Sequence, residues 1–282
     1  MSVSSSLVNS PALSIDVSVE LSVPASQAWR LIHDFGRVED WHPVVAKTHI
    51  TRGIGNAPGA VRHLTFLDGA TLEEELTAYS PEAMQLQYII TAGEFPVRNY
   101  RTTLSVEAVS SQRSRVRWVG TFDRADPGIR PAKGKDDDAA MEAVRGVYTT
   151  GLNALVELAE NIRGIEQTIG FYERGGTEGL RDVAAEAFHS SASMKFMRHG
   201  TLVDVPIAQF FSDYISAGVR QERELYIDSI DVKDTAASAR VTIDYATHQF
   251  VDFFNLLKIE GRWLIVSKIF HRVEKLKLPS EL

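Results

Sequence analysis

The chain has 282 residues, a net charge of -7 and no cysteine. Its length suits two ordinary domains, and its 44% hydrophobic and 24% charged residues are typical of a globular protein. The acidic balance and the lack of a Lys/Arg block argue against a nucleic-acid partner or an anionic membrane surface. Without cysteine there is no disulfide, thiol nucleophile or cysteine-based zinc site, which fits a cytoplasmic location.

The chain is expected to have no membrane span and a flexible start. No apolar run approaches the roughly 20 residues that a membrane-spanning helix needs. Residues 1–12 are rich in serine and lack the basic and apolar segments of a secretory signal.

The first structured segment is predicted to be a strand. Residues Ser14–Val23 alternate apolar and polar side chains, as expected of a strand with one buried face. Pro24 suits the first turn of a helix, and Gly36 suits its end. The predicted elements after the strand are a helix over Ala25–Phe35, a short helix over Arg37–Trp41 and a strand over Val44–Thr51.

The segment from Gly59 to Phe122 is predicted to form an antiparallel meander. Asp68-Gly69 between two apolar runs is a strong hairpin signal. Turn-sized gaps separate the remaining runs. The predicted strands are Gly59–Leu67, Thr71–Tyr79, Met84–Thr91, Tyr100–Val109 and Arg115–Phe122.

One face of this meander is unusually aromatic. Because side chains alternate across a strand, the apolar positions of each run share a face. This face carries Leu64, Phe66, Leu86, Tyr88, Ile90, Tyr100, Leu104, Val116, Trp118 and Phe122. Such residues can fill a core or line a ligand cavity. Taken together, these residues favour the ligand cavity over a plain core, because two tyrosine hydroxyls and one indole N–H need hydrogen-bond partners when buried.

A long helix is predicted to cover the aromatic face. Residues Ala139–Leu158 carry apolar side chains at helical spacing, including Tyr148. The polar segment Ala125–Asp138 before it is predicted to be a loop. Its run Asp136–Asp138 is interpreted as the start of the helix, because acidic residues there complement the helix dipole, and not as a metal site.

Residues 13–160 resemble the START-like superfamily, which includes polyketide cyclases/dehydrases and the birch-pollen allergen. The resemblance is carried by Pro24-Ala-Ser-Gln-Ala-Trp29, Asp34-Phe-Gly36, Trp41-His-Pro43, Pro58-Gly-Ala-Val-Arg62, Asp68-Gly69, Glu74-Glu-Leu76, Pro96-Val97, Tyr100 and Trp118-Val-Gly-Thr-Phe122. It implies an α+β helix-grip fold with a hydrophobic pocket between the sheet and the long helix. The superfamily contains enzymes, carriers and receptors, so the resemblance implies a fold more than a function.

The second half is predicted to contain helices first and strands after them. Asn161–Gly164 is expected to mark the seam between the domains 13–160 and 161–282. The predicted helices are Ile165–Gly175, Gly179–Ala187 and Pro206–Ala217, with a strand from Phe188 to Phe196 between the last two. The predicted final strands are Arg223–Lys233, Ala237–Thr247, Gln249–Glu260 and Arg262–Val273.

Residues 163–273 are similar to the nuclear transport factor 2-like superfamily, and most of all to its lumazine-binding branch. The similarity is carried by Ala187-Phe-His189, Asp252-Phe-Phe-Asn-Leu-Leu-Lys-Ile-Glu-Gly261 and Trp263-Leu-Ile-Val-Ser-Lys-Ile-Phe-His271. It implies an α+β cone that often forms homodimers through its sheet. The superfamily includes polyketide cyclases, dehydratases and ketosteroid isomerases as well as non-catalytic domains. The Tyr–Asp–Asp pattern of the isomerases is absent from matching positions.

Candidate acids and bases for proton transfer occur in both halves. In the second, Asp252 lies on an apolar strand face, where it is either a base or one half of a buried pair with Lys268. His189 directly follows a predicted helix. It is either a candidate acid or base, or a residue that interacts with the end of that helix. In the first half Glu75 is a candidate, although Arg62 on the adjacent strand offers a cross-strand pair instead.

The expected ligand is a small hydrophobic molecule. Its predicted contacts in the first half are Trp41, Leu64, Phe66, Tyr88, Tyr100, Trp118, Phe122 and Tyr148. Asp34, His42, His63 and Glu73 are further polar groups that could face the pocket. No metal-binding pair of histidines shares a face, and no Rossmann or Gly-x-Ser-x-Gly motif occurs, so neither metal nor cofactor is expected.

Two classes of function follow from these features. The first is a cofactor-independent cyclase, dehydratase or isomerase acting on a polyketide-like or aromatic substrate. The second is a non-catalytic binding or carrier protein in which the second domain serves as a dimerisation module. A buried acid or base beside open cavity volume would favour the enzyme, and an apolar pocket with paired charges would favour the binding protein.

Overall fold

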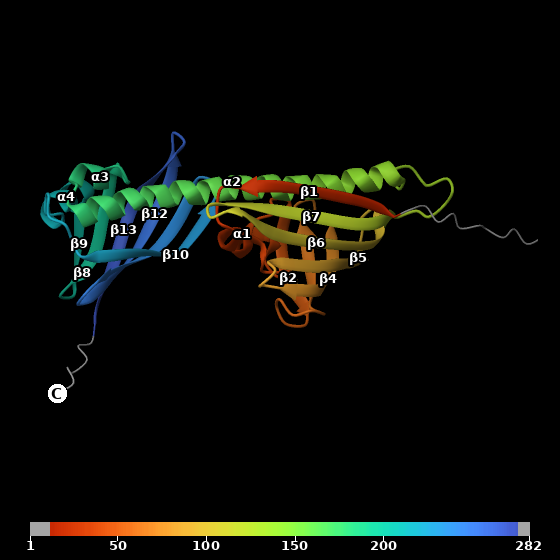
Figure 1. Cartoon of the computed structure of the whole chain (residues 1–282), viewed down its shortest axis with the longest axis horizontal. Helices are drawn as coiled ribbons and strands as arrows, with labels where there is room; N and C mark the ends of the chain where they lie inside the picture. Colours follow the sequence, from red (N-terminus) through yellow and green to blue (C-terminus); the bar gives the residue numbers. More distant parts are fainter. Residues whose placement is uncertain (1–11, 276–282) are drawn as a thin grey trace, which may run out of the picture. The chain divides into compact units, whose positions relative to one another are not determined.

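A computed structural model of the chain describes residues 12–275 and shows an α+β protein with two large sheets and few helices (Figure 1). The chain divides into two compact units, with the division between Glu160 and Asn161. Of the predicted flexible start, only Ala12 lies within the described residues.

The first unit contains a seven-stranded antiparallel sheet in the order β1-β7-β6-β5-β4-β3-β2. Its strands are β1 (Leu13–Leu21), β2 (Val45–Arg52), β3 (Val61–Phe66), β4 (Thr71–Ser80), β5 (Gln85–Gly93), β6 (Val97–Ser110) and β7 (Arg113–Arg124). Neighbours in sequence are neighbours in the sheet from β2 to β7, which confirms the meander. Strand β1 closes the other edge by pairing with β7, with Val17 opposite Trp118.

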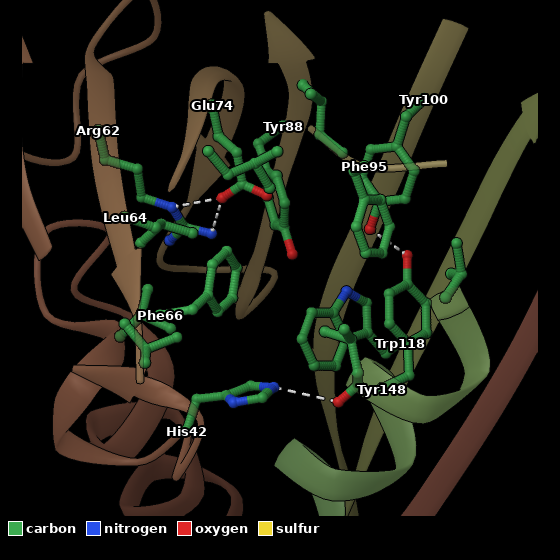
Figure 2. Close-up of a pocket in the computed structure, with 16 residues that line it drawn as sticks. His42, Arg62, Leu64, Phe66, Glu74, Tyr88, Phe95, Tyr100, Trp118 and Tyr148 are labelled. Atoms are coloured by element: carbon green, nitrogen blue, oxygen red, sulfur yellow. Dashed lines mark hydrogen bonds and ion pairs between the residues drawn. The ribbon is translucent and has the colours of Figure 1, made fainter. Parts of the chain in front are cut away.

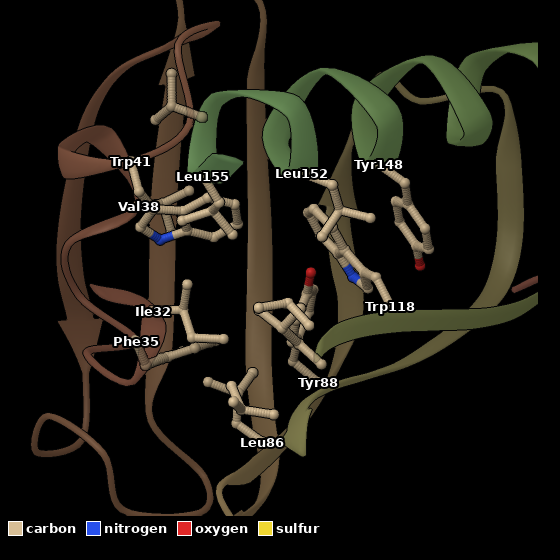
Figure 3. Packing of buried hydrophobic residues seen from close by; sticks show 14 of the residues in the cluster. Ile32, Phe35, Val38, Trp41, Leu86, Tyr88, Trp118, Tyr148, Leu152 and Leu155 are labelled. Carbon is tan, nitrogen blue, oxygen red and sulfur yellow. The ribbon is translucent and has the colours of Figure 1, made fainter. Parts of the chain in front are cut away.

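Helices of the first unit cover one face of this sheet. Between β1 and β2 lie α1 (Ala25–Ile32) and the short 3-10 helix η1 (Val38–Asp40). The long helix α2 (Asp137–Glu178) begins where the aspartate run predicted it, and Asp136 Oδ1 accepts a hydrogen bond from the Ala139 N–H. Tyr148, Leu152 and Leu155 of α2 reach from the helix toward Trp118 and other buried side chains of the sheet (Figure 3).

Helix α2 runs unbroken through residues 161–164, where the sequence predicted one helix to end at Leu158 and the next to begin at Ile165. A single internal glycine costs a helix only about 1 kcal/mol relative to alanine. Ile162 and Ile165 flank Gly164 and are both buried, so packing favours continuing the helix. A Cβ at Gly164 would lie 2.9 Å from Trp263 Cδ1, so this glycine allows close packing and does not end the helix.

The second unit contains a six-stranded sheet in the order β10-β11-β12-β13-β8-β9. Its elements are α3 (Arg181–Ala185), β8 (Phe188–Arg198), β9 (Thr201–Pro206), α4 (Ile207–Tyr214), β10 (Arg223–Lys233), β11 (Ala236–Tyr245), β12 (His248–Ile259) and β13 (Arg262–Glu274). All neighbouring strands are antiparallel except β13 and β8, which are parallel. The sequence did not predict β9, whose short run Thr201–Pro206 is mostly exposed.

Buried apolar side chains form a separate core in each unit. The core of the second unit draws Ile165, Ile169 and Tyr172 from α2 and packs them on the sheet with Phe254 and Ile265. Within residues 12–275, no helix combines the length and the apolar character needed to cross a membrane.

Candidate functional site

The aromatic face of the first sheet encloses a small pocket against α2 (Figure 2). Its volume is ≈ 40 Å³. The residues that line it are Val38, His42, Val45, Arg62, Leu64, Phe66, Leu72, Glu74, Tyr88, Ile90, Phe95, Tyr100, Trp118, Val144, Val147 and Tyr148. Most of this lining is apolar, so the few polar groups in it decide what the pocket can do.

A buried ion pair occupies one wall of the pocket. Arg62 on β3 donates from Nε to Glu74 Oε2 on β4 at 2.6 Å, and its Nη2 lies 2.5 Å from the same oxygen. Its Nη1 donates to the Phe35 carbonyl at 3.0 Å, and the guanidinium lies over the rings of Phe35 and Tyr88. Burial raises the pKa of Glu74, while Arg62 opposes this shift. The pair therefore places two compensated charges inside an otherwise apolar wall.

A second polar group joins the sheet to α2. The Tyr148 hydroxyl lies 2.5 Å from the Tyr100 hydroxyl and 2.6 Å from Thr102 Oγ1. Thr102 Oγ1 also donates to the Val119 carbonyl at 2.8 Å. A Cβ at Gly120 would collide with the Tyr148 hydroxyl, so glycine on β7 makes room for it. Burial raises the pKa values of both tyrosines, which keeps these hydroxyls protonated.

His42 adds an uncharged imidazole ring to the pocket. Its ring is buried and packs against Trp41 and Trp118. Burial lowers the pKa of His42 to about 4, so the ring is uncharged at neutral pH. Nε2 lies 3.0 Å from the Val147 carbonyl and must carry the proton, because a carbonyl only accepts. Nδ1 is therefore a buried acceptor, and it has no hydrogen-bond partner among the described residues.

Trp118 and Tyr88 place two more polar tips beside the pocket (Figures 2 and 3). The Trp118 indole stacks on Tyr148, with ring centroids 4.1 Å apart. Within residues 12–275, its Nε1 makes no hydrogen bond of ordinary distance and angle. Burial raises the pKa of Tyr88 well above its usual value, so its hydroxyl stays protonated. A ligand with a polar oxygen would thus meet donors as well as the His42 acceptor.

Most of the ligand contacts predicted from the sequence come together here. The predicted residues that line the pocket are Leu64, Phe66, Tyr88, Tyr100, Trp118 and Tyr148. Trp41 and Phe122 instead lie in the adjacent core, where Trp41 packs on Trp118 and Phe122 packs on Tyr100.

The carboxylate in the pocket is Glu74 and not Glu75. Side chains alternate on β4, and Glu75 on the opposite face pairs with Arg52 at 2.8 Å. The expected Arg62–Glu75 pair is therefore wrong, because Arg62 pairs with Glu74. Strand parity could have found this: Leu72, Glu74 and Leu76 share the buried face, and Arg62 shares a face with Leu64. Asp34, His63 and Glu73 are not among the lining residues.

The second unit has a larger cavity of ≈ 250 Å³. Its lining consists of Tyr172, Gly176, Met194, Phe210, Tyr214, Ile215, Ser216, Gln221, Arg223, Ile243, Tyr245, Phe250, Lys268 and Phe270. Lys268 Nζ lies 2.7 Å from Asp252 Oδ2, so the buried pair expected from the sequence is present. Both groups also hydrogen-bond to the Tyr172 hydroxyl. Burial opposes the charge of Lys268, but Asp252 and Tyr172 outweigh this effect and raise its pKa.

The other predicted acid or base of the second unit lies apart from this cavity. His189, on β8, is only partly buried, and its Nδ1 contacts Ser191 Oγ at 2.7 Å. It is not among the lining residues, and neither is Asp252, which is fully buried behind Lys268. Within the described part of the chain, no three His, Asp or Glu side chains are placed to hold a metal ion.

Comparisons with curated proteins find two relatives that each match about a third of the chain. The abscisic acid receptor PYL2 of Arabidopsis thaliana is 28% identical over 101 residues, which are 35% of this chain and 53% of the receptor. The aldolase FrzH of Cladobotryum sp is 26% identical over 102 residues, which are 36% of this chain and 82% of the aldolase. The chain thus spans about half the length of the receptor.

A solved structure and two families match the halves of the chain. An NTF2-like protein of unknown function from Shewanella baltica OS155 is 34% identical, with a TM-score of 0.37, over 40% of this chain and 94% of that one. Residues 160–271 match the family described as "Putative lumazine-binding". Residues 12–160 match the family described as polyketide cyclase / dehydrase and lipid transport. A START-like first half is therefore fused to a nuclear transport factor 2-like second half. The match over residues 12–160 covers more than half of the chain, so the chain belongs to the polyketide cyclase / dehydrase and lipid transport family.

Proposed function

We propose that the chain is a binding protein for a small hydrophobic molecule, aromatic or polyketide-like, which occupies the pocket between α2 and the first sheet. In this proposal the first unit is a helix-grip domain and the second a cone. The observation that carries it is the pocket wall, where apolar side chains surround paired charges and a few unpaired polar tips. Trp118 Nε1 can donate to a ligand oxygen, and His42 Nδ1 can accept from a ligand hydroxyl.

The pocket must widen to admit such a ligand, because ≈ 40 Å³ is less than a ring needs. A cavity that is known to hold benzene has a volume of about 150 Å³. The lining residues Phe66, Ile90, Phe95 and Val147 are only partly buried and belong to the outer edge of the pocket. We expect these side chains to move when a ligand enters, while the buried wall at Arg62 stays in place.

Isothermal titration calorimetry with 2-naphthol tests this proposal. Val147→Phe places a ring at the edge of the pocket and should weaken binding at least tenfold. Val156→Phe is the matched control, because Val156 is equally half-buried on the same helix but does not line the pocket. The proposal fails if 2-naphthol does not bind saturably, or if both variants bind it equally.

An enzyme of the cyclase, dehydratase or isomerase type is the second candidate function, favoured by one observation. Glu74, whose pKa is raised by burial, and neutral His42 with its free Nδ1 face the same apolar pocket. Each could take a proton from a carbon next to a ketone, which is the step that begins such reactions. We assign the role of acid or base to Glu74 and His42. The catalytic roles expected from the sequence for Glu75, His189 and Asp252 stay predictions.

Proton exchange in D2O tests the catalytic alternative without a known substrate. We expect the protein to accelerate deuterium uptake next to the carbonyl of 2-tetralone, followed by NMR. Glu74→Gln should remove most of the acceleration, and His42→Gln provides a second variant if the first fails to fold. The enzyme alternative is rejected if the native protein gives the same exchange rate as buffer.

We further propose that the chain forms a homodimer through the outer face of the second sheet. The large apolar side chains exposed there include Tyr226, Phe253, Leu257, Ile269 and Val273. Phe253 and Ile269 are directly opposite each other on β12 and β13, so they form a continuous patch. Such a surface marks an interaction site more often than a free face.

A further inference from the structure

The cavity of the second unit is large enough for a ligand as it stands. Its ≈ 250 Å³ exceed the cavity of about 150 Å³ that holds benzene, so a molecule of one or two rings fits. Six of its lining residues are aromatic, contributed by α2, α4, β11, β12 and β13: Tyr172, Phe210, Tyr214, Tyr245, Phe250 and Phe270. Aromatic walls of this kind favour a flat ligand body.

The charges around this cavity do not cancel. Lys268 is neutralised by Asp252. Arg223, at the start of β10, also lines the cavity, yet none of the ion pairs among residues 12–275 includes it. No carboxylate belongs to the described lining. One uncompensated positive charge therefore remains at the wall.

Arg223 is held in place by neutral oxygen atoms. Its Nε donates to Thr177 Oγ1 at 3.0 Å, and its Nη1 donates to the Tyr245 hydroxyl at 3.2 Å. Its Nη2 donates to the carbonyls of Tyr172 and Glu173, at 3.5 and 3.1 Å. These contacts hold the Arg223 guanidinium in place without neutralising its positive charge. Since Nη1 carries two protons and gives one to Tyr245, one N–H is left for a ligand.

A glycine on α2 makes this position possible. A Cβ at Gly176 would collide with Nη2 of Arg223. The guanidinium can therefore lie directly against the helix backbone, within reach of the two carbonyls. Gly176 also lines the cavity, so the helix, the arginine and the open volume meet at one place.

We propose that this cavity is a second ligand site, which takes a flat molecule of one or two rings carrying a single negative charge, such as an aromatic carboxylate. Arg223 binds the anionic group, with the Tyr245 hydroxyl as a neighbouring donor, and the aromatic side chains enclose the rings. This site shares no residue with the pocket of the first unit and does not depend on the function proposed for that pocket.

A matched pair of ligands tests the charge preference. Calorimetry at pH 7.5 compares 2-naphthoate with 2-naphthamide, which has the same rings and no charge. A hydrogen bond to a charged partner is strong enough to favour the anion about tenfold or more. Equal affinities, or no binding of 2-naphthoate, would overturn the proposal.

Variants then locate the site. Arg223→Gln should weaken 2-naphthoate binding about tenfold and remove the preference over the amide, and Gly176→Ala should do the same by displacing the guanidinium. Arg223→Lys keeps the charge and should retain part of the preference, which guards against a folding defect in the other two. Arg262→Gln, an equal charge change at the exposed first residue of β13, should have no effect.

The first-unit variant Val147→Phe separates the two sites. It should leave 2-naphthoate binding unchanged, whether or not 2-naphthol binds to the first pocket. If Val147→Phe abolishes 2-naphthoate binding, or if the anion preference survives Arg223→Gln, the anionic ligand does not sit at Arg223 and the inference is wrong.

Discussion

Acid should destabilise the first unit through His42. The pKa of this buried imidazole is lowered from 6.5 to about 4, so the folded unit takes up a proton less readily than the unfolded chain. At pH 5 the unfolded histidine is protonated and the folded one is not. Lowering the pH therefore favours the unfolded state, and the stability that is fully present above pH 6.5 is lost as the pH falls toward 4.

The size of this effect follows from the two pKa values. One pKa unit is worth 1.36 kcal/mol, which gives a full loss of about 3 kcal/mol by pH 4. Most of it, about 2 kcal/mol, should already be lost between pH 7.5 and pH 5. That is a large share of the ~5–15 kcal/mol that stabilises a typical domain.

Urea unfolding of the native protein and of His42→Gln at both pH values measures this loss of stability. Three of the four tryptophans, Trp29, Trp41 and Trp118, belong to the core of the first unit and Trp263 to that of the second, so tryptophan fluorescence reports mainly on the first unit. Glutamine does not titrate, and its amide can still donate to the Val147 carbonyl. The stability advantage of the native protein over His42→Gln should shrink by about 2 kcal/mol from pH 7.5 to pH 5.

A second histidine provides the control. His199 is exposed at the turn between β8 and β9, with a φ of 50° that asparagine also tolerates. The pH dependence of the difference between the native protein and His42→Gln should exceed that found with His199→Asn. If the two differences depend on pH to the same extent, the His42 imidazole is not held neutral, and its assignment as an acceptor in the pocket is refuted.

Three further predictions concern buried polar groups and the proposed dimer surface. Asp252→Ala should cost the second unit about 3–5 kcal/mol in urea unfolding, because the Lys268 charge loses its partner, and adding Lys268→Met should recover most of this. Tyr148→Phe should cost the first unit about 1–3 kcal/mol, because the buried Tyr100 hydroxyl loses its partner and the Thr102 hydroxyl keeps only its bond to the Val119 carbonyl. Phe253→Lys should convert the proposed dimer to a monomer in analytical ultracentrifugation, and an unchanged sedimentation coefficient would reject that interface.

The alternation of apolar and polar residues predicted most of the first sheet from the sequence. Apolar alternation located every strand of the first sheet to within a few residues, and turn signals such as Asp68-Gly69 fixed their order as a meander. Strand β1 forms the other edge of the sheet, and its partner was not predictable from local patterns. Its pairing with β7 joins residues about a hundred positions apart.

The site is less predictable from the sequence, because the partner in a cross-strand charge pair depends on which face of its strand each side chain takes. Glu74 lies between two buried leucines on β4, but a glutamate on an apolar face is expected to be rare without a partner. The partner, Arg62, lies on the same face of the next strand. Reading the faces of the two strands together would have found the pair. The free charge of Arg223 gave no such signal, since its four acceptors are far from it in the sequence.

The two cavities differ in the charge that they present, and this difference predicts different ligands. Each lies beside one buried ion pair and several aromatic rings, with Arg62–Glu74 in the first unit and Lys268–Asp252 in the second. Such pairs are net neutral, so they orient polar groups of a ligand without selecting its charge. In the first unit the imidazole of His42 is also neutral at pH 7, whereas Arg223 leaves the second cavity positive. A neutral ligand and an anionic ligand can therefore occupy the same chain without competing for one site.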